Sequence, residues 1–314
     1  MRLATPVPSV YDLPHSILKY LHIGTCSWKY PEWSRVGVYT KDYDPKKGNF
    51  LEHYSKFYDT VEVDQWFWSL YTPKFVKLPS PRMAKEYAAA VPKNFLFSVK
   101  APNSITLTHF YSKGAQAKQY PELAGKPNKH FLSADLVRKF LRALEPMENK
   151  LGPIMFEFEY LNKEKMESLE VFLAALENFF KQIPAGYQYS VESRNPNYLK
   201  PSYFALLKEY KIAHVFLEGY YMPPVSTVLK LQRALTSRHT VFRLHGPDRE
   251  GMAQRSGGVW DRIRIDRSPL LEEIGSILKM VIEERISTFV NVNNHFEGCA
   301  PVSIVKLLRG FGVT

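Results

Sequence analysis

Short apolar runs alternate with amphipathic stretches along the chain. The runs are rich in β-branched and aromatic residues and show little strict alternation of apolar and polar positions. This pattern is typical of strands that are covered on both faces. It predicts eight strands, at residues 22–27, 60–65, 95–100, 153–158, 188–193, 213–217, 240–245 and 288–294.

Helical periodicity falls between these strands. The clearest helix is predicted at 162–184, with Asn162 as its N-cap and Pro184 as its end. Its apolar stripe consists of Met166, Leu169, Phe172, Leu173, Leu176 and Phe180. Further helical patterns occupy residues 45–58, 133–147, 200–212, 268–285 and 301–311.

The order of these elements predicts a single-domain (β/α)8 TIM-type barrel, with a core at about residues 20–312. A doubly wound open sheet is the alternative, but it usually needs fewer strands. No glycine-rich dinucleotide loop and no GxxxxGK[ST] phosphate loop follows any of the strands. The sequence shows no linker that would divide the chain.

Two connections are unusually long, at residues 101–132 and 246–268. Both are rich in glycine, proline and basic residues, and in a barrel both lie on the face where the strands end. Long loops without secondary structure are often functional lids, although they can also be tolerated insertions. We expect lids that cover a site.

Composition narrows the classes of partner. The chain has 314 residues and a net charge of +11. This charge favours an anionic binding partner, such as nucleic acid, a phosphorylated small molecule or an anionic surface. The alternative is that the charge only aids solubility. No apolar run reaches the length of about 18 residues that a membrane span needs, and the N-terminus has no secretory signal pattern. We therefore expect a cytoplasmic protein that does not bind a membrane.

Polar side chains follow nearly every predicted strand at its carboxyl end, where such barrels place their chemistry. Charged residues in strands are costly to bury unless they are paired. The residues are Glu62 and Asp64, Lys100, Glu157 and Glu159, Glu192 and Arg194, Arg243 and His245, and Asn291, Asn293, Asn294 and His295. We predict acid/base catalysis by Glu62, Glu192 and His245. Pairing of Glu62 with Lys100 or Arg194 as scaffold remains an equal alternative.

The last strand and the helix after it predict an anion site. In these barrels a helix N-terminus near strands seven and eight commonly binds phosphate. Gly298 and Ala300 would let a ligand approach the backbone, and Asn293 and Asn294 would donate hydrogen bonds. The full predicted set of ligand-binding residues is Trp28, Tyr30, Lys100, His109, Arg194, Asn293, Asn294 and Ala300. Trp28, Tyr30, Phe67 and Trp68 offer walls for a ring, unless they only pack.

Metal binding is left open by the residues. Glu62, Asp64, Glu157 and Glu192 with His109, His245 and His295 could ligate a divalent cation. No close pair such as HxH or HExxH appears, so we assign no metal ligands. Cys26 and Cys299 follow the first and last strands, which become neighbours in a closed barrel. They could be metal ligands or a redox pair, but we expect small buried residues.

Six motifs resemble the domain of unknown function 72, or YecE-like, family. They are "GTCSWKYPEW", "VEVDQWFWSL", "FLFSVKAPNSITLTH", "VESRNPNY", "FRLHG" and "NVNNHFEGCA", in this order along nearly the whole chain. The resemblance implies a TIM-type barrel but no reaction, and the likeness of such barrels to metal-dependent endonuclease IV and sugar isomerases is an analogy of fold. It implies family-typical residues at Gly24, Trp28, Tyr30, Glu62, Phe67, Lys100, Thr108, His109, Glu192, Arg194, His245, Gly246, Asn293, Asn294 and Ala300.

The chain departs from this family pattern in two places. The family usually has Asn-Ser-Thr-Phe-Tyr where this chain has residues 64–68, Asp-Gln-Trp-Phe-Trp, and a serine is common at Cys26. Both changes fall in the predicted site, so the ligand need not be shared with other members.

Two classes of function follow. The first is an enzyme that binds an anionic, phosphate-bearing ligand and performs hydrolysis or acid/base chemistry. The second is a non-catalytic nucleic-acid or nucleotide binder. A metal-dependent phosphodiesterase resembling endonuclease IV is a further alternative.

Overall fold

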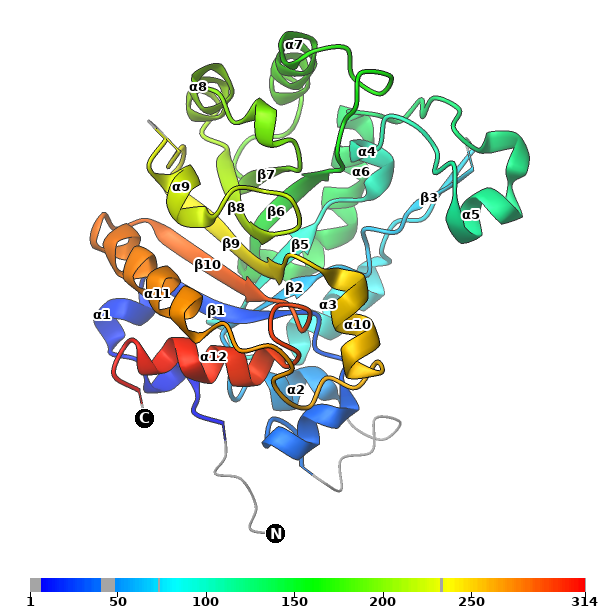
Figure 1. The fold of residues 1–314 in the computed structure, drawn as a ribbon. Coiled ribbons are helices and arrows are strands. Elements are labelled where there is room, and N and C mark those ends of the chain that lie inside the picture. Colours follow the sequence, from blue (N-terminus) through cyan, green and yellow to red (C-terminus); the bar gives the residue numbers. More distant parts are fainter. Residues whose placement is uncertain (1–6, 41–48, 73, 232–233, 314) are drawn as a thin grey trace.

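Eight parallel strands close into a barrel in the computed structural model, which describes residues 7–40, 49–72, 74–231 and 234–313 (Figure 1). The strands are β1 (Leu21–Cys26), β2 (Thr60–Val63), β5 (Leu96–Lys100), β6 (Leu151–Phe158), β7 (Tyr189–Ser193), β8 (Ala213–Gly219), β9 (His239–Gly246) and β10 (Ser287–Val292). Their order is β1-β10-β9-β8-β7-β6-β5-β2 and back to β1. This closure confirms the predicted (β/α)8 barrel and excludes the open sheet.

Helices surround the strands in Figure 1. The α-helices are α1 (His15–Leu18), α2 (Phe50–Tyr54), α3 (Pro81–Ala89), α4 (Asn103–Thr106), α5 (Gly114–Gln119), α6 (Ala134–Leu144), α7 (Leu169–Phe180), α8 (Pro201–Glu209), α9 (Val225–Leu229), α10 (Arg249–Ser256), α11 (Ser268–Glu283) and α12 (Ala300–Arg309). Short 3-10 helices lie at Val10–Asp12, Pro31–Val36, Pro121–Leu123, Glu145–Lys150 and Pro196–Tyr198.

The clearest predicted helix begins later than expected. α7 starts at Leu169, and Ser168 caps it by accepting a hydrogen bond from the Val171 amide. Asn162 instead closes a separate turn, in which its side chain accepts from the Lys165 amide at 3.0 Å. Both residues can cap a helix, and the sequence does not show which one the fold uses. The helix predicted at 45–58 begins at Phe50, and residues 45–48 lie outside the described part of the chain.

The two long connections contain more structure than predicted. The first holds α4, α5 and a 3-10 turn, and the second holds α10. Between β2 and α3 the chain also forms a hairpin of β3 (Leu70–Thr72) and β4 (Phe75–Val76), which the sequence pattern did not predict. The hairpin strands are only three and two residues long, too short for a periodic signal.

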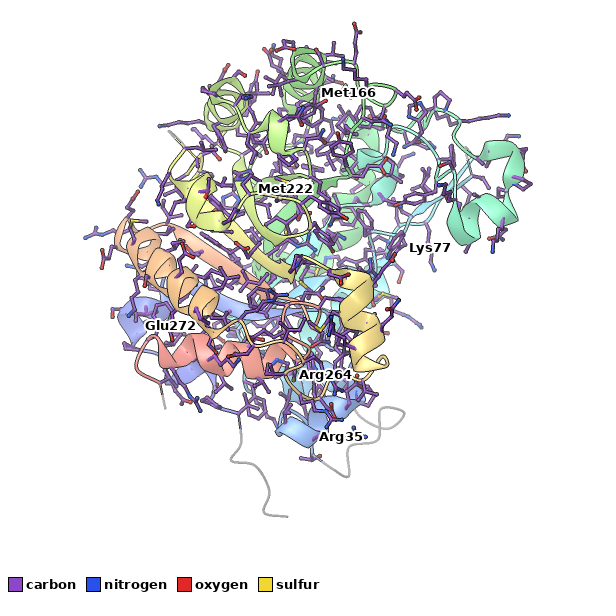
Figure 2. The ribbon with its side chains drawn as sticks, in the orientation of Figure 1. Arg35, Lys77, Met166, Met222, Arg264 and Glu272 are labelled. Atoms are coloured by element: carbon purple, nitrogen blue, oxygen red, sulfur yellow. The ribbon has the colours of Figure 1, made fainter. Side chains whose placement is uncertain are left out.

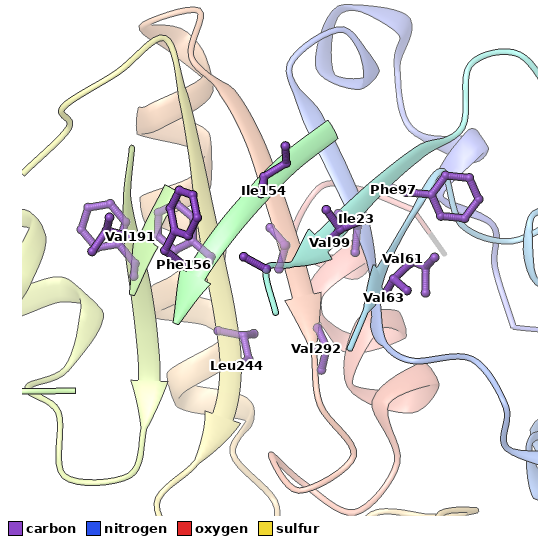
Figure 3. Packing of buried hydrophobic residues seen from close by; sticks show 14 of the residues in the cluster. Ile23, Val61, Val63, Phe97, Val99, Ile154, Phe156, Val191, Leu244 and Val292 are labelled. Carbon is purple, nitrogen blue, oxygen red and sulfur yellow. The ribbon is translucent and has the colours of Figure 1, made fainter. Parts of the chain in front are cut away.

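Side chains along the barrel strands alternate between a helix-facing layer and the barrel interior. On β2, Val61 and Val63 pack in the main apolar core, as Figure 3 shows, while Glu62 between them is buried inside the barrel. A separate apolar cluster of Met155, Val215, Val241 and Phe289 fills the interior further from the carboxyl ends of the strands. Two residues further along β6, β9 and β10, the interior carries Glu157, Arg243 and Asn291, and this change to polar side chains positions the site.

Candidate functional site

A cavity of about 300 Å³ opens where the barrel strands end. Strands β2, β5, β6 and β9 supply Glu62, Lys100, Glu157, Arg243 and His245, and the segments that follow the strands, including the start of α10, supply the rest of the wall. The other lining residues are Tyr30, Asp64, Phe67, Trp68, Leu107, Tyr111, Glu159, Arg194, Tyr220, Arg249, Asn293 and His295.

Arg243 forms the centre of the cavity floor. Its Nε and Nη2 donate to the two carboxylate oxygens of Glu62, at 2.8 and 2.6 Å. Its Nη1 donates to Glu157 Oε2 at 2.9 Å and also to Glu192 Oε2. One guanidinium from β9 thereby holds three carboxylates from β2, β6 and β7, which only a closed barrel brings together.

Lys100 and Arg194 complete this ionic network. Lys100 Nζ lies 2.8 Å from Glu157 Oε2. Arg194 contacts Glu157 Oε1 at 3.0 Å through Nη2 and Glu192 Oε1 at 2.9 Å through Nε. The predicted pairing of Glu62 with Lys100 or Arg194 is wrong, because Glu62 pairs with Arg243. Lys100 and Arg194 pair with Glu157 and Glu192 instead.

Electrostatics keep the network charged. Burial by itself would raise the pKa of Glu157, but the charges of Lys100, Arg194 and Arg243 outweigh burial and hold the pKa well below its ordinary value. Burial likewise opposes the charge of Arg243, and the surrounding glutamates raise the pKa of its guanidinium well above the ordinary value. The three carboxylates and three cations pair with each other, so the floor has no surplus of positive charge.

Two lining carboxylates stay outside this network: Glu159, which pairs with Lys165 at 2.7 Å, and Asp64. Among the described residues, no side chain donates a hydrogen bond to it or forms an ion pair with it within 4.0 Å. Burial and then the nearby charge of Glu62 raise the pKa of Asp64 above its ordinary value, partly offset by Lys100. A half-buried carboxyl group of this kind can give or take a proton next to a bound molecule.

His245 lies beside the network and is neutral. Its Nδ1 lies 3.0 Å from the Tyr220 hydroxyl, and its Nε2 lies 3.6 Å from Cys26 Sγ. Burial lowers the pKa of His245 well below its ordinary value, and the charges of Arg243 and Arg194 add to this effect. Its imidazole is therefore uncharged at neutral pH and offers one lone pair.

The wall has one further cation, Arg249 at the start of α10. Within the described parts of the chain, Arg249 lacks a carboxylate partner, and its side chain is exposed. Of the other lining residues, Asn293 Oδ1 accepts from the His295 amide at 2.9 Å and pairs with His295 Nδ1. Arg249 is therefore the wall cation most available to a ligand.

The structure brings most of the predicted site residues together and leaves some apart. Glu62, Tyr30, Lys100, Arg194, His245 and Asn293 line the cavity. Glu192 is fully buried behind the floor. Trp28 is also buried and packs edge-on against Tyr87, and His109 lines a neighbouring hollow.

At the start of α12, a side chain of the protein itself takes the hydrogen bond that a ligand was expected to accept. The Ala300 amide donates to Asn294 Oδ1 at 2.9 Å, and both residues are buried. The expectation that Gly298 leaves room for a ligand is wrong, because a Cβ there would lie 2.6 Å from Arg264 Cγ and 2.8 Å from the Arg262 carbonyl oxygen. The chain near Arg264, labelled in Figure 2, covers this turn. Neither Asn294 nor Ala300 is among the cavity-lining residues.

Aromatic side chains surround the cavity. Phe67 lies against Lys100, whose Nζ is 3.8 Å from the ring centre, and Tyr220 lies against Arg194. Trp68 on the rim is 54% exposed. A neighbouring hollow of about 710 Å³ shares Arg194 and Tyr220 with the cavity and includes Tyr160 and Tyr221, which are 59% and 94% exposed. Exposed rings beside a polar cavity provide flat surfaces for a ligand ring.

Sequence reasoning did not assign roles to Arg243, Tyr220 and Arg249. Arg243 stands two residues before His245 on one strand, so strand alternation places both in the interior, and this signal was available. Tyr220 follows β8, for which the sequence analysis named no charged residues at the carboxyl end. It has a positive φ of 53° after Gly219, which the sequence does not reveal.

Cys26 and Cys299 are both buried free thiols, as expected of small buried residues. They have different surroundings. Cys26 Sγ lies 3.5 Å from Glu62 Oε2, whereas Cys299 is the residue that precedes α12. No contact between the two sulfur atoms occurs in the described structure.

The family model described as "Protein of unknown function DUF72" matches residues 22–314. The chain belongs to this family. DUF72 proteins of known structure share its fold: one from Thermotoga maritima is 19% identical, with a TM-score of 0.63 over 92% of this chain and 98% of the other. One from Enterococcus faecalis is 18% identical, with a TM-score of 0.61 over 94% and 96%. These similarities show the fold alone.

The chain is also similar to a curated relative whose name states no activity. The UPF0759 protein YecE of Escherichia coli is 22% identical over 178 residues, which cover 57% of this chain. The match spans only 50% of the length of YecE. Among the described residues of this DUF72 chain, no helix has both the length and the apolar character needed to span a membrane.

Proposed function

We propose that this DUF72 barrel binds a small polar ligand with one anionic group, such as a phosphate, and performs hydrolysis or proton transfer on it. The observation that carries the proposal is the convergence of a fixed ionic network, an unpaired carboxyl group and an unpaired arginine in one cavity of about 300 Å³. Buried ion networks contribute little net stability, so their cost is consistent with a role in function.

Charge decides what kind of ligand fits. Lys100, Arg194 and Arg243 already have carboxylate partners, which leaves Arg249 as the wall cation that can pair with a ligand. One available cation can neutralise one anionic group of a ligand. A ligand with several negative charges would be repelled by the carboxylates of the floor. The aromatic rim would hold a flat or cyclic portion of the ligand.

Asp64 is the group we assign to proton transfer. Glu62 and Glu192, the carboxylates that the sequence suggested, both accept hydrogen bonds from Arg243, so these oxygens are already occupied. Asp64 faces the same cavity without such a partner. Lys100 and Arg194 would then orient the ligand, because the network fixes their side chains.

Ligand binding is tested with a matched pair of arginine variants. Ribose 5-phosphate and AMP should bind more tightly than ribose and adenosine in calorimetry. Arg249→Gln should weaken binding of the phosphorylated probes by roughly 10- to 150-fold, the effect of one hydrogen bond to a charged group. Arg255→Gln makes the same change on the same helix outside the cavity and should have no effect. Equal loss in both variants, or no preference for phosphate, would contradict the proposal.

Asp64→Asn tests the chemistry. In a screen of phosphorylated probes for turnover, the variant should lose about 100-fold or more in kcat, the usual contribution of a general acid or base. Binding should change little, since the amide keeps the size of the carboxyl group. Unchanged kcat would remove Asp64 from the reaction.

Nucleic-acid binding is the alternative that the net charge of +11 supports. The dependence of binding affinity on salt concentration distinguishes the two functions. A single-stranded oligonucleotide bound through several phosphates should lose affinity steeply between about 50 and 200 mM salt. We expect a shallow dependence for the phosphorylated small probes and weak oligonucleotide binding.

A further inference from the structure

Three ligating atoms from different strands meet at one side of the cavity floor. Cys26 Sγ lies 3.5 Å from Glu62 Oε2 and 3.6 Å from His245 Nε2, and the three atoms all lie within 4.8 Å of one another. The strand register explains this proximity, because Cys26 on β1 lies opposite Glu62 on β2. All three residues are buried.

We propose that Cys26, Glu62 and His245 bind a divalent metal ion of the zinc type. A thiolate, an imidazole and a carboxylate are the ligand types that zinc prefers. A tetrahedral ion with bonds of about 2.3 Å to sulfur and about 2.0–2.1 Å to nitrogen or oxygen separates sulfur from its neighbours by about 3.5 Å. The two separations from Cys26 Sγ agree with this value.

The neighbours of these residues leave the required lone pairs available. The Tyr220 hydroxyl oxygen can accept the Nδ1–H of His245 at 3.0 Å, and the imidazole then presents its lone pair at Nε2. Arg243 Nε donates to Glu62 Oε2 at 2.8 Å and leaves a second lone pair on that oxygen. Partners that orient metal ligands in this way are typical of protein metal sites.

A fourth coordination position would face the cavity, because Glu62 and His245 both line it. Sites with three protein ligands and an open position are the catalytic type rather than the structural type. On β10, between the strands of Cys26 and His245, the Asn291 side chain is fully buried, and neither its Nδ2 nor its Oδ1 has a hydrogen-bond partner in the described structure. Buried amides are rarely left unpaired, so this side chain is consistent with a polar occupant nearby.

The alternative is a metal-free cluster in which the Cys26 thiol donates to Glu62. Such a cluster would have little affinity for added metal. This distinction is independent of the proposed function, because it can be measured with the metal alone and without any ligand of the cavity.

The test is cobalt binding to the full chain after removal of metals by a chelator. One equivalent of Co²⁺ should produce a near-ultraviolet band from thiolate-to-cobalt charge transfer and visible bands of a four-coordinate ion. Added Zn²⁺ should displace the cobalt and abolish both features. The absence of bands in the unsubstituted chain at excess Co²⁺ would overturn the proposal.

The two cysteines provide a matched control. Cys26→Ser should remove the charge-transfer band and weaken metal binding by at least about 10-fold. Cys299→Ser should keep the band and the unaltered affinity for metal. Tyr220→Phe should keep the band and weaken binding by about 10-fold, the effect of losing an orienting partner. Circular dichroism of each variant verifies folding. A band that survives in Cys26→Ser, or that disappears in Cys299→Ser, would refute the assignment.

Discussion

Arg243 shows how one residue organises the barrel mouth. Its side chain is 2% exposed and holds Glu62, Glu157 and Glu192 together. Removing one partner from a buried ion network leaves the opposite charges without compensation, which costs more than the network contributed. The residue is therefore needed to pair three buried glutamates inside one barrel.

Replacing Arg243 should destabilise the protein strongly. Arg243→Met should lower the free energy of unfolding by about 3–5 kcal/mol, as measured by urea denaturation. Adding Glu62→Gln should recover part of the loss, because the double variant removes one of the uncompensated charges. If the double variant loses the sum of both single effects, Arg243 and Glu62 are not energetically coupled, which would contradict the ion pair between them.

At the scale of elements, the contact between β1 and β2 depends on a glycine. A Cβ on Gly24 would lie 1.9 Å from the Thr60 carbonyl oxygen and 2.9 Å from the Tyr54 hydroxyl. A side chain there would push apart two strands that close the barrel. By contrast, a Cβ on Gly275 in α11 would meet its nearest neighbour, Leu307, at 3.7 Å.

These two glycines should respond to alanine in opposite ways. Gly24→Ala should cost more than about 4 kcal/mol or prevent folding, because the neighbouring atoms belong to backbone. Gly275→Ala should stabilise the protein by about 0.5–1 kcal/mol, because alanine favours the helix and the space is sufficient. Thermal unfolding of both variants measures the difference, and similar transition temperatures would contradict the predicted close approach at Gly24.

For the whole molecule, two buried histidines on the barrel strands make stability depend on pH. Burial lowers the pKa of His214 to about 3 and that of His239 to about 4. His214 contacts the Tyr203 hydroxyl and the Phe204 and Phe216 rings. His239 lies beside the Ser190 and Ser237 hydroxyls and the Tyr189 carbonyl. Among the described residues, no carboxylate pairs with either histidine to favour its charged form.

Acid should therefore unfold the protein. Both pKa values are depressed in the folded state, so stability is complete above about pH 6.5 and decreases as pH falls toward 4, where only the unfolded chain takes up these protons. Each histidine accounts for a loss on the order of 3 kcal/mol. His214→Phe should flatten the fall in unfolding free energy between pH 6.5 and 4. An unchanged slope would mean that His214 does not stay neutral.

Much of this architecture could be predicted from the order of apolar runs. All eight barrel strands lie within a few residues of their predicted positions, because buried β-branched and aromatic runs have few alternatives to a covered parallel sheet. Smaller features could not be predicted. The hairpin of β3 and β4 is too short to show a period, and the choice of Ser168 over Asn162 as the cap of α7 depends on where that helix packs.

The sequence by itself determined which kinds of residue reach the mouth of the barrel, because position along a strand and alternation fix the end and the face on which a side chain lies. Only the tertiary structure decided which of them pair. Glu62, Glu157 and Glu192 are held by Arg243, while Asp64 and Arg249 are left for a ligand and Cys26 faces His245. Those pairings depend on distances across the closed barrel, which follow from strand register and not from spacing along the chain.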